Sequence, residues 1–313
     1  MRGMILRRLR TSAVLLLLAS MLCFGLVVAA PGNVAVLIAE LRTPGATFAE
    51  IAAIEDELGL NNPLPVRYAD WLKGALTGEF GISYKTGQDV GEAMRNRIPV
   101  TGALLAGAAI FAVLASLALG FIGALRPYGM IDRATRAVAL FGASTPSFFV
   151  GAMLVYLFSV QLGWLPSFGL GGPETWLMPW ITLGLLPGAI LSRVVRVGLE
   201  ETMARPFILT ARSKGLKRNT ILFRDALPNI APAFVTALGA QMAAMTVGTV
   251  VVEPLFAWQG VGELFLQGVR FRDYMVVQSG LLIFVCFFIV LNLMVDLAVM
   301  FLDPKLRRQG SRT

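Results

Sequence analysis

Six long stretches of this chain carry almost no charge, and they restrict its possible folds more than any other feature. A helix that crosses a bilayer needs about 20 consecutive apolar residues, because each residue adds about 1.5 Å along the helix axis. Stretches of this kind cover residues 11–30, 98–125, 137–161, 175–192, 229–252 and 274–295, and the last one continues to about residue 302. We therefore predict an all-α integral membrane protein with about six transmembrane helices.

The composition excludes a water-soluble fold. Of the 313 residues, 56% are hydrophobic and 15% are charged, whereas a soluble domain carries about 25% charged residues. A formal net charge of +8 would suggest nucleic acid as the partner of a soluble protein, but in a membrane protein it first reports topology. We expect membrane lipid as a partner and no nucleic acid.

Lysine and arginine are distributed unevenly among the connecting segments. Nineteen of the 27 such residues lie in the N-terminus, in residues 126–136 and 193–228, and in the tail after Asp303. Cytoplasmic loops carry this kind of excess. Both termini should therefore be cytoplasmic, and residues 31–97, 162–174 and 253–273 should lie outside.

The same pattern divides the chain into five parts. They are a cytoplasmic N-terminus at 1–10, a first transmembrane helix at 11–30, an extracytoplasmic segment at 31–97, a five-helix core at 98–302 and a cytoplasmic tail at 303–313. The first helix could instead be a signal peptide, since four arginines precede it. However, its apolar run exceeds the roughly 7–15 residues of a signal-peptide core, and Pro31 follows the small-residue site Val28-Ala29-Ala30. We expect the helix to be retained.

The extracytoplasmic segment contains two helix signals. Thr47 and Glu50 have the spacing of a capping box, which predicts a helix that ends near Leu58 with Gly59 as its stop. Residues 64–76 have the periodicity of a second, amphipathic helix. The residues favour a cap on the outer membrane face over a docking or gating surface for a delivery protein, and both interpretations stay open.

The segment of residues 201–228 joins two apolar stretches and is rich in positive charge. Residues 206–214 predict a short helix, with Pro206 at its first position and Gly215 as a left-handed stop. It is far too short to span the bilayer, so it should lie at the cytoplasmic surface. Leu227-Pro228 should begin the fifth span. The residues alone leave three interpretations: an interfacial helix on anionic lipid, a polar linker, or a surface offered to a partner.

Four polar or charged residues lie within or beside the apolar stretches. Asp296 follows Asn292 by one helical turn in the last span, and intramembrane carboxylates are costly. Arg193 and Arg196 are three residues apart near the inner end of the fourth span. They could pair with Asp296 or serve as positive-inside anchors. A hydrogen bond from Asp296 to a neighbouring helix is the alternative to a functional role.

The chain lacks the residue patterns of an enzyme. It contains no histidine, and its two cysteines, Cys23 and Cys286, lie inside apolar runs, as expected for packing residues. It also lacks the glycine-rich loop that binds nucleotide phosphates in many ATPases. We expect no catalytic residue, no metal site and no ATP hydrolysis by this chain alone.

The charged segment resembles the EAA loop of ABC-importer permeases. In that motif Glu-Ala-Ala is followed by three residues, glycine, nine residues and Ile-x-Leu-Pro. Here Ala211, Gly215 and Leu227-Pro228 occupy the matching positions, with nine residues from Leu216 to Arg224. The sequence departs from the motif at Leu209 in place of Glu, Thr210 in place of the first Ala, and Asp225 in place of Ile.

Other stretches resemble the dipeptide, oligopeptide and nickel permeases of that family. They are residues 57–60 with 63–66 and Tyr68, Gly81-Ile82-Ser83-Tyr84, Gly260 to Leu264 with Arg272-Asp273-Tyr274, and Leu302-Asp303-Pro304. The resemblance covers nearly the whole chain. The single span followed by a long outer segment resembles the first of the two permease subunits.

The resemblance implies a type I ABC importer permease fold in the bacterial cytoplasmic membrane. It implies a non-catalytic subunit that forms half of a path for di- or oligopeptides. The expected partners are a homologous second permease subunit, two cytoplasmic ATPases that use ATP and Mg, and an extracytoplasmic peptide-binding protein. The residues expected to couple to the ATPases are Pro206, Phe207, Leu209, Thr210, Ala211, Arg212, Lys214, Gly215, Leu216, Leu227 and Pro228.

Three other functions are alternatives to peptide import. Within the family, the same machinery could import nickel or another small solute. An ion-coupled secondary transporter would be expected to carry several membrane carboxylates and internal repeats, whereas we find one embedded Asp and no clear repeat. An integral-membrane enzyme has little support, because no nucleophile motif or paired intramembrane carboxylates occur.

Overall fold

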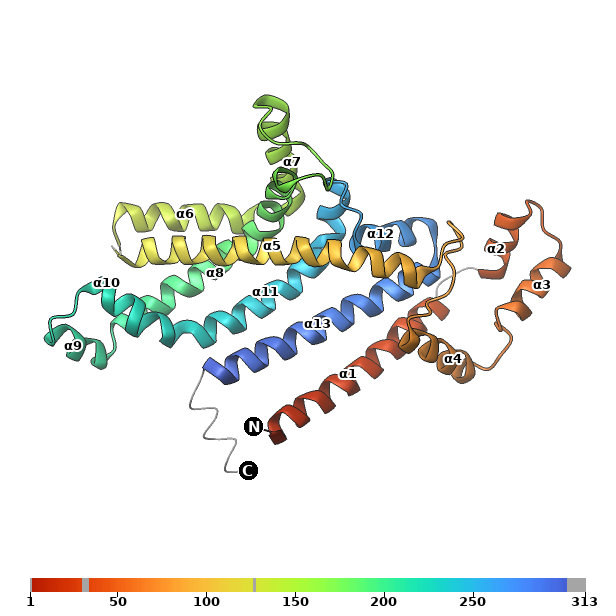
Figure 1. The fold of residues 1–313 in the computed structure, drawn as a ribbon, viewed down its shortest axis with the longest axis horizontal. Helices are drawn as coiled ribbons and strands as arrows, with labels where there is room; N and C mark the ends of the chain where they lie inside the picture. Colours follow the sequence, from red (N-terminus) through yellow and green to blue (C-terminus); the bar gives the residue numbers. More distant parts are fainter. Residues whose placement is uncertain (1, 30–33, 126–127, 303–313) are drawn as a thin grey trace. The chain divides into compact units, whose positions relative to one another are not determined.

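The computed structural model of the chain describes residues 2–29, 34–125 and 128–302. The predicted tail at 303–313 lies outside these ranges. In the described part the regular structure is helical, apart from one antiparallel bridge between Ile82 and Asp89. The helices (Figure 1) are α1 Arg2–Val28, α2 Val34–Arg42, α3 Phe48–Glu57, α4 Leu64–Thr77, α5 Val90–Leu125, α6 Met130–Ser144, α7 Ser147–Leu154, η1 Val155–Gln161, η2 Pro173–Thr175, α8 Leu177–Met203, α9 Pro206–Ser213, α10 Arg218–Ile221, η3 Leu222–Ala226, α11 Leu227–Leu255, α12 Val261–Phe271 and α13 Tyr274–Leu302.

The structure confirms the prediction of about six transmembrane helices. Within the described residues, five helical stretches are long and apolar enough to cross a bilayer. They are Leu6–Val28, Val90–Leu125, Pro173–Met203, Arg218–Leu255 and Tyr274–Leu302. A bent pair, Met130–Ser144 with Ser147–Gln161, makes a sixth when it is counted as one span.

The third predicted span, residues 137–161, is corrected by the structure. Its helix begins earlier, at Met130, and breaks after Ser144, and the two halves are bent by 106°. The cause is Pro146, which cannot donate a helical hydrogen bond and forces the residue before it to be extended. Thr145 accordingly has φ −96° and ψ 125°. Pro187, in contrast, lies inside α8, which continues past it without a break.

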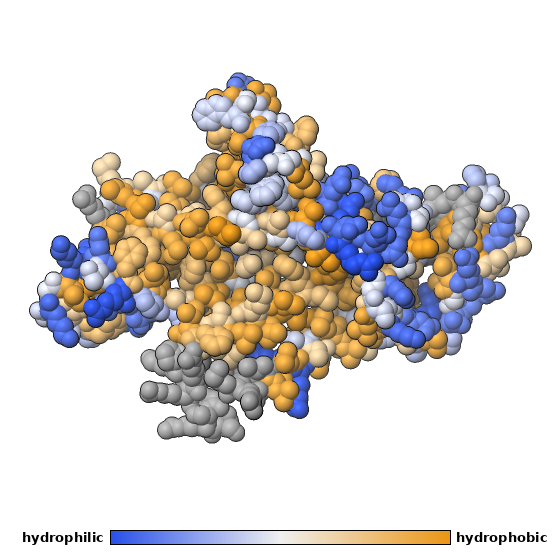
Figure 2. All heavy atoms as spheres, viewed as in Figure 1, coloured by the Kyte–Doolittle hydropathy of each residue, from blue (hydrophilic) through white to orange (hydrophobic). Residues whose placement is uncertain are grey.

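The chain forms two compact units, and the first consists of residues 1–9, 101–258 and 288–313. In this unit α8 packs against α6, α7 and α11. Figure 2 shows hydrophobic side chains over α5 and α6 and hydrophilic ones over α9 and α10. This distribution fits spanning helices that end in a loop at a membrane surface.

Two glycines bring α8 close to α5. A Cβ atom at Gly184 would lie 2.6 Å from the carbonyl oxygen of Ala108, and one at Gly188 would lie 3.3 Å from the Cα of Ala112. Small residues four positions apart on facing helices allow this close approach in membranes. The α5–α8 contact therefore depends on the absence of side chains rather than on interlocking large ones.

The second unit consists of residues 10–100 and 259–287. Its helices α2 and α3 share a small core of Ala35, Ile38, Ala39 and Ile54. The capping box of α3 is confirmed, because Thr47 accepts from the backbone of Glu50 while the Glu50 carboxylate accepts from the Thr47 N–H at 2.7 Å. That bond lowers the pKa of Glu50 below its ordinary value. Gly59 has the predicted positive φ, +61°.

Two of the stretches that resemble the permease family, residues 81–84 and 272–274, meet in the second unit. Ser83 donates a hydrogen bond of 2.5 Å to the buried carboxylate of Asp273, 190 residues further along the chain. The Lys85 ammonium lies 3.1 Å from the ring centroid of Phe271. Burial raises the pKa of the neighbouring Tyr84 phenol, and the charge of Asp273 adds to this rise.

Candidate functional site

The predicted short helix is present as α9, and its ends have the predicted chemistry. Arg205 is extended, and Pro206 occupies the first turn, where a missing N–H costs no hydrogen bond. At the other end Gly215 has φ +76°. The N–H of Gly215 donates to Arg212 O at 2.9 Å, and that of Leu216 donates to Ala211 O at 3.3 Å. This pair of bonds is the Schellman motif.

One side of α9 is anchored and the other is exposed. Ile208 is fully buried, and Ala211, one turn later, is half-buried. Leu209 is 61% exposed and Phe207 is also exposed, although both are large and apolar. Arg212 and Lys214 are exposed as well. The helix therefore presents an apolar tip with a basic end, and a single buried isoleucine fixes it to the rest of the chain.

The segment after α9 is fastened to the ends of the spanning helices. Ile221, Leu222 and Ala226 are buried, and the last two belong to a core with Val195 and Leu199 of α8. Arg218 of α10 donates a hydrogen bond of 2.8 Å to the backbone oxygen of Ala124 at the end of α5. α11 begins at Leu227, as predicted. A displacement of α9 would consequently act on the packed ends of α5, α8 and α11.

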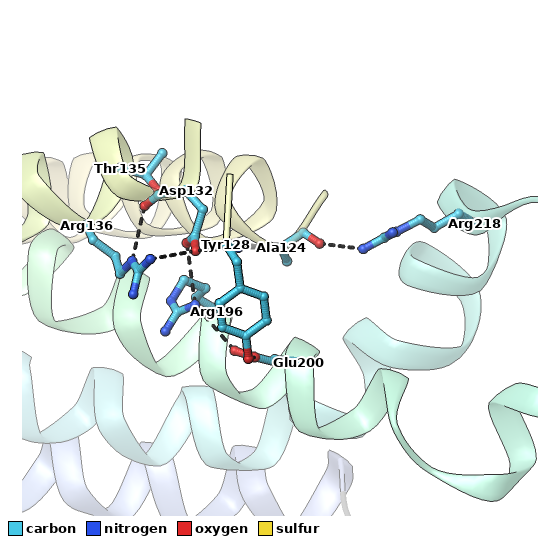
Figure 3. Close-up of polar contacts among 8 residues, drawn as sticks. All are labelled: Ala124, Tyr128, Asp132, Thr135, Arg136, Arg196, Glu200 and Arg218. Carbon is cyan, nitrogen blue, oxygen red and sulfur yellow. Dashed lines mark hydrogen bonds and ion pairs between the residues drawn. The ribbon is translucent and has the colours of Figure 1, made fainter. Parts of the chain in front are cut away.

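A polar cluster lies on α6 and α8 beside this core (Figure 3). The Asp132 carboxylate is fully buried and accepts from the N–H of Tyr128 at 3.0 Å. It also pairs with Arg136 at 3.0 Å and with Arg196 of α8 at 3.4 Å. The buried charge is thus compensated by three donors, as a carboxylate in a low-dielectric setting requires.

A second carboxylate completes this cluster. Glu200 accepts from the Tyr128 hydroxyl at 2.6 Å and pairs with Arg196 at 3.3 Å. The hydrogen bond to Glu200 raises the pKa of Tyr128 above its ordinary value, because it favours the protonated phenol. Asp132, Glu200 and Tyr128 were not predicted as site residues from the sequence. The four-residue spacings Asp132–Arg136 and Arg196–Glu200 were the available signals.

The intramembrane polar residues have other partners than those considered from the sequence. Asp296 pairs with Arg8 of α1 at 2.8 Å, and not with Arg193 or Arg196. Asn292 donates to the backbone oxygen of Phe288, one turn back on its own helix. Arg196 joins the cluster of Asp132 and Glu200. Arg193 is exposed and lines a cavity between α5, α6 and α8.

A second embedded carboxylate was missed. Glu253 follows the uncharged stretch 229–252, but α11 continues to Leu255, so its carboxylate is fully buried. Thr101 of α5 donates a hydrogen bond of 2.6 Å to it. The prediction of a single embedded acid is therefore wrong. Among the residues that the structure describes, no three His, Cys, Asp or Glu side chains are grouped as metal ligands.

Comparisons with known proteins relate this geometry to a family. Residues 116–308 match the family model described as binding-protein-dependent transport system inner membrane component, and residues 1–105 match the N-terminal model of the same transport systems. The probable peptide ABC transporter permease protein y4tP of Sinorhizobium fredii is 33% identical, over 97% of this chain and 98% of its own length. The dipeptide transport system permease protein DppB of Alkalihalophilus pseudofirmus is 30% identical, over 96% and 98%.

Solved structures support the same fold. The MetNI methionine ABC transporter in an inward-facing conformation superposes with a TM-score of 0.57 at 19% identity, and the match covers 67% of this chain and 96% of that one. At this identity the likeness concerns the fold alone. The family match extends over most of the chain, and the relatives match it from end to end. The chain therefore belongs to the family of binding-protein-dependent transport system inner membrane components, and it is an integral inner-membrane permease subunit of an ABC importer.

Proposed function

We propose that this permease carries di- or oligopeptides and that α9 is the element through which an ATPase drives it. The peptide substrate is supported by the relatives, one named a probable peptide permease, another a dipeptide permease and a third the glutathione permease GsiC of Escherichia coli, which is 32% identical. The role of α9 is supported by its geometry, and above all by the exposed Leu209 on a helix capped at both ends.

The proposed assembly contains a second permease subunit, two cytoplasmic ATPases and an extracytoplasmic binding protein. In this arrangement the two ATPases bind ATP and Mg, and this chain performs no catalysis. Both termini and α9 lie in the cytoplasm, while residues 31–97 lie outside. The excess of Lys and Arg in residues 193–228 supports this orientation.

The apolar tip of α9 suits a groove on the ATPase. Phe207 and Leu209 would lose water-exposed surface on docking, which contributes about 25 cal/mol for each Å² buried. ATP-driven closure then moves α9, and the packed contacts of Ile208, Ile221 and Leu222 transmit this movement to the spanning helices. The permease alternates between two shapes because the ATPases bind one of them more tightly in each nucleotide state.

Site-specific photocross-linking tests the docking. A benzophenone amino acid at position 209 of the chain, in the importer assembled with its own subunits, should cross-link to the ATPase. The yield of this cross-link should differ between vanadate-trapped complexes and complexes without nucleotide. The same probe at Phe48, which is 91% exposed in the outer segment, should give no ATPase product. Equal ATPase yields at the two positions, or none at position 209 in an intact complex, would refute the proposal.

The variant Gly215→Val tests whether the shape of α9 matters for coupling. A β-branched residue disfavours the left-handed conformation of Gly215 by about 1–3 kcal/mol, so the Schellman cap should be lost. Apart from its chain neighbours, no atom of the described residues lies within 4 Å of a Cβ at Gly215, so the packing should survive. We expect ATP hydrolysis to continue while peptide uptake into vesicles falls about tenfold. Normal uptake would show that the cap is not needed.

A further inference from the structure

The first unit contains a cavity that has no part in the proposed transport function. Its volume is about 430 Å³, and it lies between α5, α6 and α8. Much of its wall is apolar, with Leu119, Ala139, Leu140, Ala143, Ala189 and Ile190. Arg136, Arg193 and Arg196 line it as well. A cavity with apolar walls and three guanidinium groups suits an amphipathic anion.

The charge around the cavity is incompletely balanced. Asp132 and Glu200 are the two carboxylates paired with Arg136 and Arg196. Arg196 reaches both through one nitrogen, Nη1, at 3.4 and 3.3 Å, which is longer than the 2.7–2.9 Å typical of strong charge-assisted bonds. The guanidinium group of Arg193 makes no hydrogen bond or ion pair within the described part of the chain. Three guanidinium groups thus face two carboxylates, which leaves one positive charge without a partner.

The position of Arg193 on its helix restricts the source of the missing anion. It lies 16 residues after Leu177, the first residue of α8, which corresponds to about 24 Å along the axis. Because the hydrocarbon core is about 30 Å thick, Arg193 lies near the level of one layer of headgroups. Nearby on α6, Leu140 and Phe141 are 69% and 67% exposed, as expected for side chains that contact acyl chains.

We propose that this cavity binds an anionic phospholipid. The lipid phosphate would accept hydrogen bonds from Arg193 and from the unused donors of Arg196, and one acyl chain would lie along Leu119, Leu140 and Ile190. Basic pockets between spanning helices bind anionic headgroups. The inference requires only that the helices cross the membrane, and it is independent of the role of α9.

Native mass spectrometry of the full chain in detergent, with equal phosphatidylglycerol and phosphatidylcholine added, tests this site. We expect phosphatidylglycerol to be retained preferentially. Arg193→Gln should lower its affinity about fivefold relative to the matched variant Arg133→Gln, as expected for one contact worth about 1 kcal/mol. Arg133 is an exposed α6 arginine that does not line the cavity. Neither substitution removes an ion pair seen in the described residues, so both proteins should fold.

Competition experiments distinguish the lipid from soluble anions. Excess inorganic phosphate or a dipeptide should leave phosphatidylglycerol bound, because neither supplies an acyl chain for the apolar wall. Displacement by phosphate would assign the site to a soluble anion, and displacement by the dipeptide would assign it to the substrate. Either result, or an equal affinity of the Arg193→Gln and Arg133→Gln variants, would overturn the lipid assignment.

Discussion

The spanning helix α8 differs sharply from the two helices α1 and α13 at the ends of the chain. In the most apolar 18 residues of the stretch that contains α8, 61% of the residues are buried within the chain. The corresponding share is 11% for the stretch in α1 and 11% for that in α13. Yet the membrane-spanning stretch that contains α8 is the least apolar of the three, and Arg193, Arg196 and Glu200 lie in α8. A helix that faces lipid must be apolar all round, while an enclosed helix can carry polar groups that its neighbours satisfy. Hydropathy therefore identifies spans but does not identify the core.

The largest difference in stability between these helices should come from replacing a glycine that lies at a helix contact. A leucine at Gly184 would meet the backbone of Ala108 and the ring of Phe111, so α5 and α8 could not stay in contact. We expect Gly184→Leu to destabilise the protein by about 3 kcal/mol, the upper range for overpacking. Thermal unfolding in detergent would measure this. Gly25→Leu in α1 is the matched control, since within the described residues a Cβ there would meet no atom within 4 Å beyond its own helical turn. An equal loss would contradict the comparison.

The cost of removing an ion pair should also differ between the enclosed helix and the helices at the chain ends, but by less than the cost of the glycine substitutions. Asp132 is fully buried and pairs with Arg196 of α8, whereas Asp296 of α13 is 30% exposed and pairs with the exposed Arg8. Asp132→Asn should cost about 2 kcal/mol, since Arg136 and Arg196 keep partial contact with solvent. Asp296→Asn should cost about 0.5 kcal/mol. Denaturant unfolding of both variants, with an Asp132–Arg196 double-mutant cycle, provides the measurement. Similar costs would mean that burial within the chain does not set the strength of these pairs.

The smallest effect concerns Tyr128 and Glu200, the exposed part of the polar cluster on α6 and α8. The hydrogen bond to Glu200 raises the pKa of Tyr128 above its ordinary value of about 10. The stabilisation is fully present below that ordinary pKa and is lost as pH rises through the higher folded value. Spectroscopic titration of tyrosinate should assign the shifted group to Tyr128, through its absence in Tyr128→Phe. Glu200→Gln should return the pKa towards about 10. An unchanged titration in that variant would exclude the hydrogen bond as the cause.

The sequence alone determined the features that depend on neighbouring residues. The uncharged stretches predicted the spanning helices, because the bilayer leaves no alternative for an apolar segment of that length. Thr47 with Glu50 predicted the start of α3, while Pro206 with Gly215 predicted both ends of α9. In each of these cases the residues that carry the signal also make the contact, or carry the φ angle, that fixes the structure. The motif spacing from Ala211 to Pro228 likewise indicated the family.

Tertiary structure alone decided which side chains meet. Asp296 had several conceivable partners, and the structure selects Arg8, almost the full length of the chain away. Asp132 and Glu253 belong to segments that were predicted to connect the spans, yet both side chains are fully buried. Arg196 of α8 pairs with the first, and Thr101 of α5 donates a hydrogen bond to the second. The local sequence around Pro146 accounts for a break, but it does not contain the 106° angle between the two halves or the contacts of α7 with α8 and α11. Burial and pairing between distant segments depend on how whole helices pack, and no local pattern contains that information.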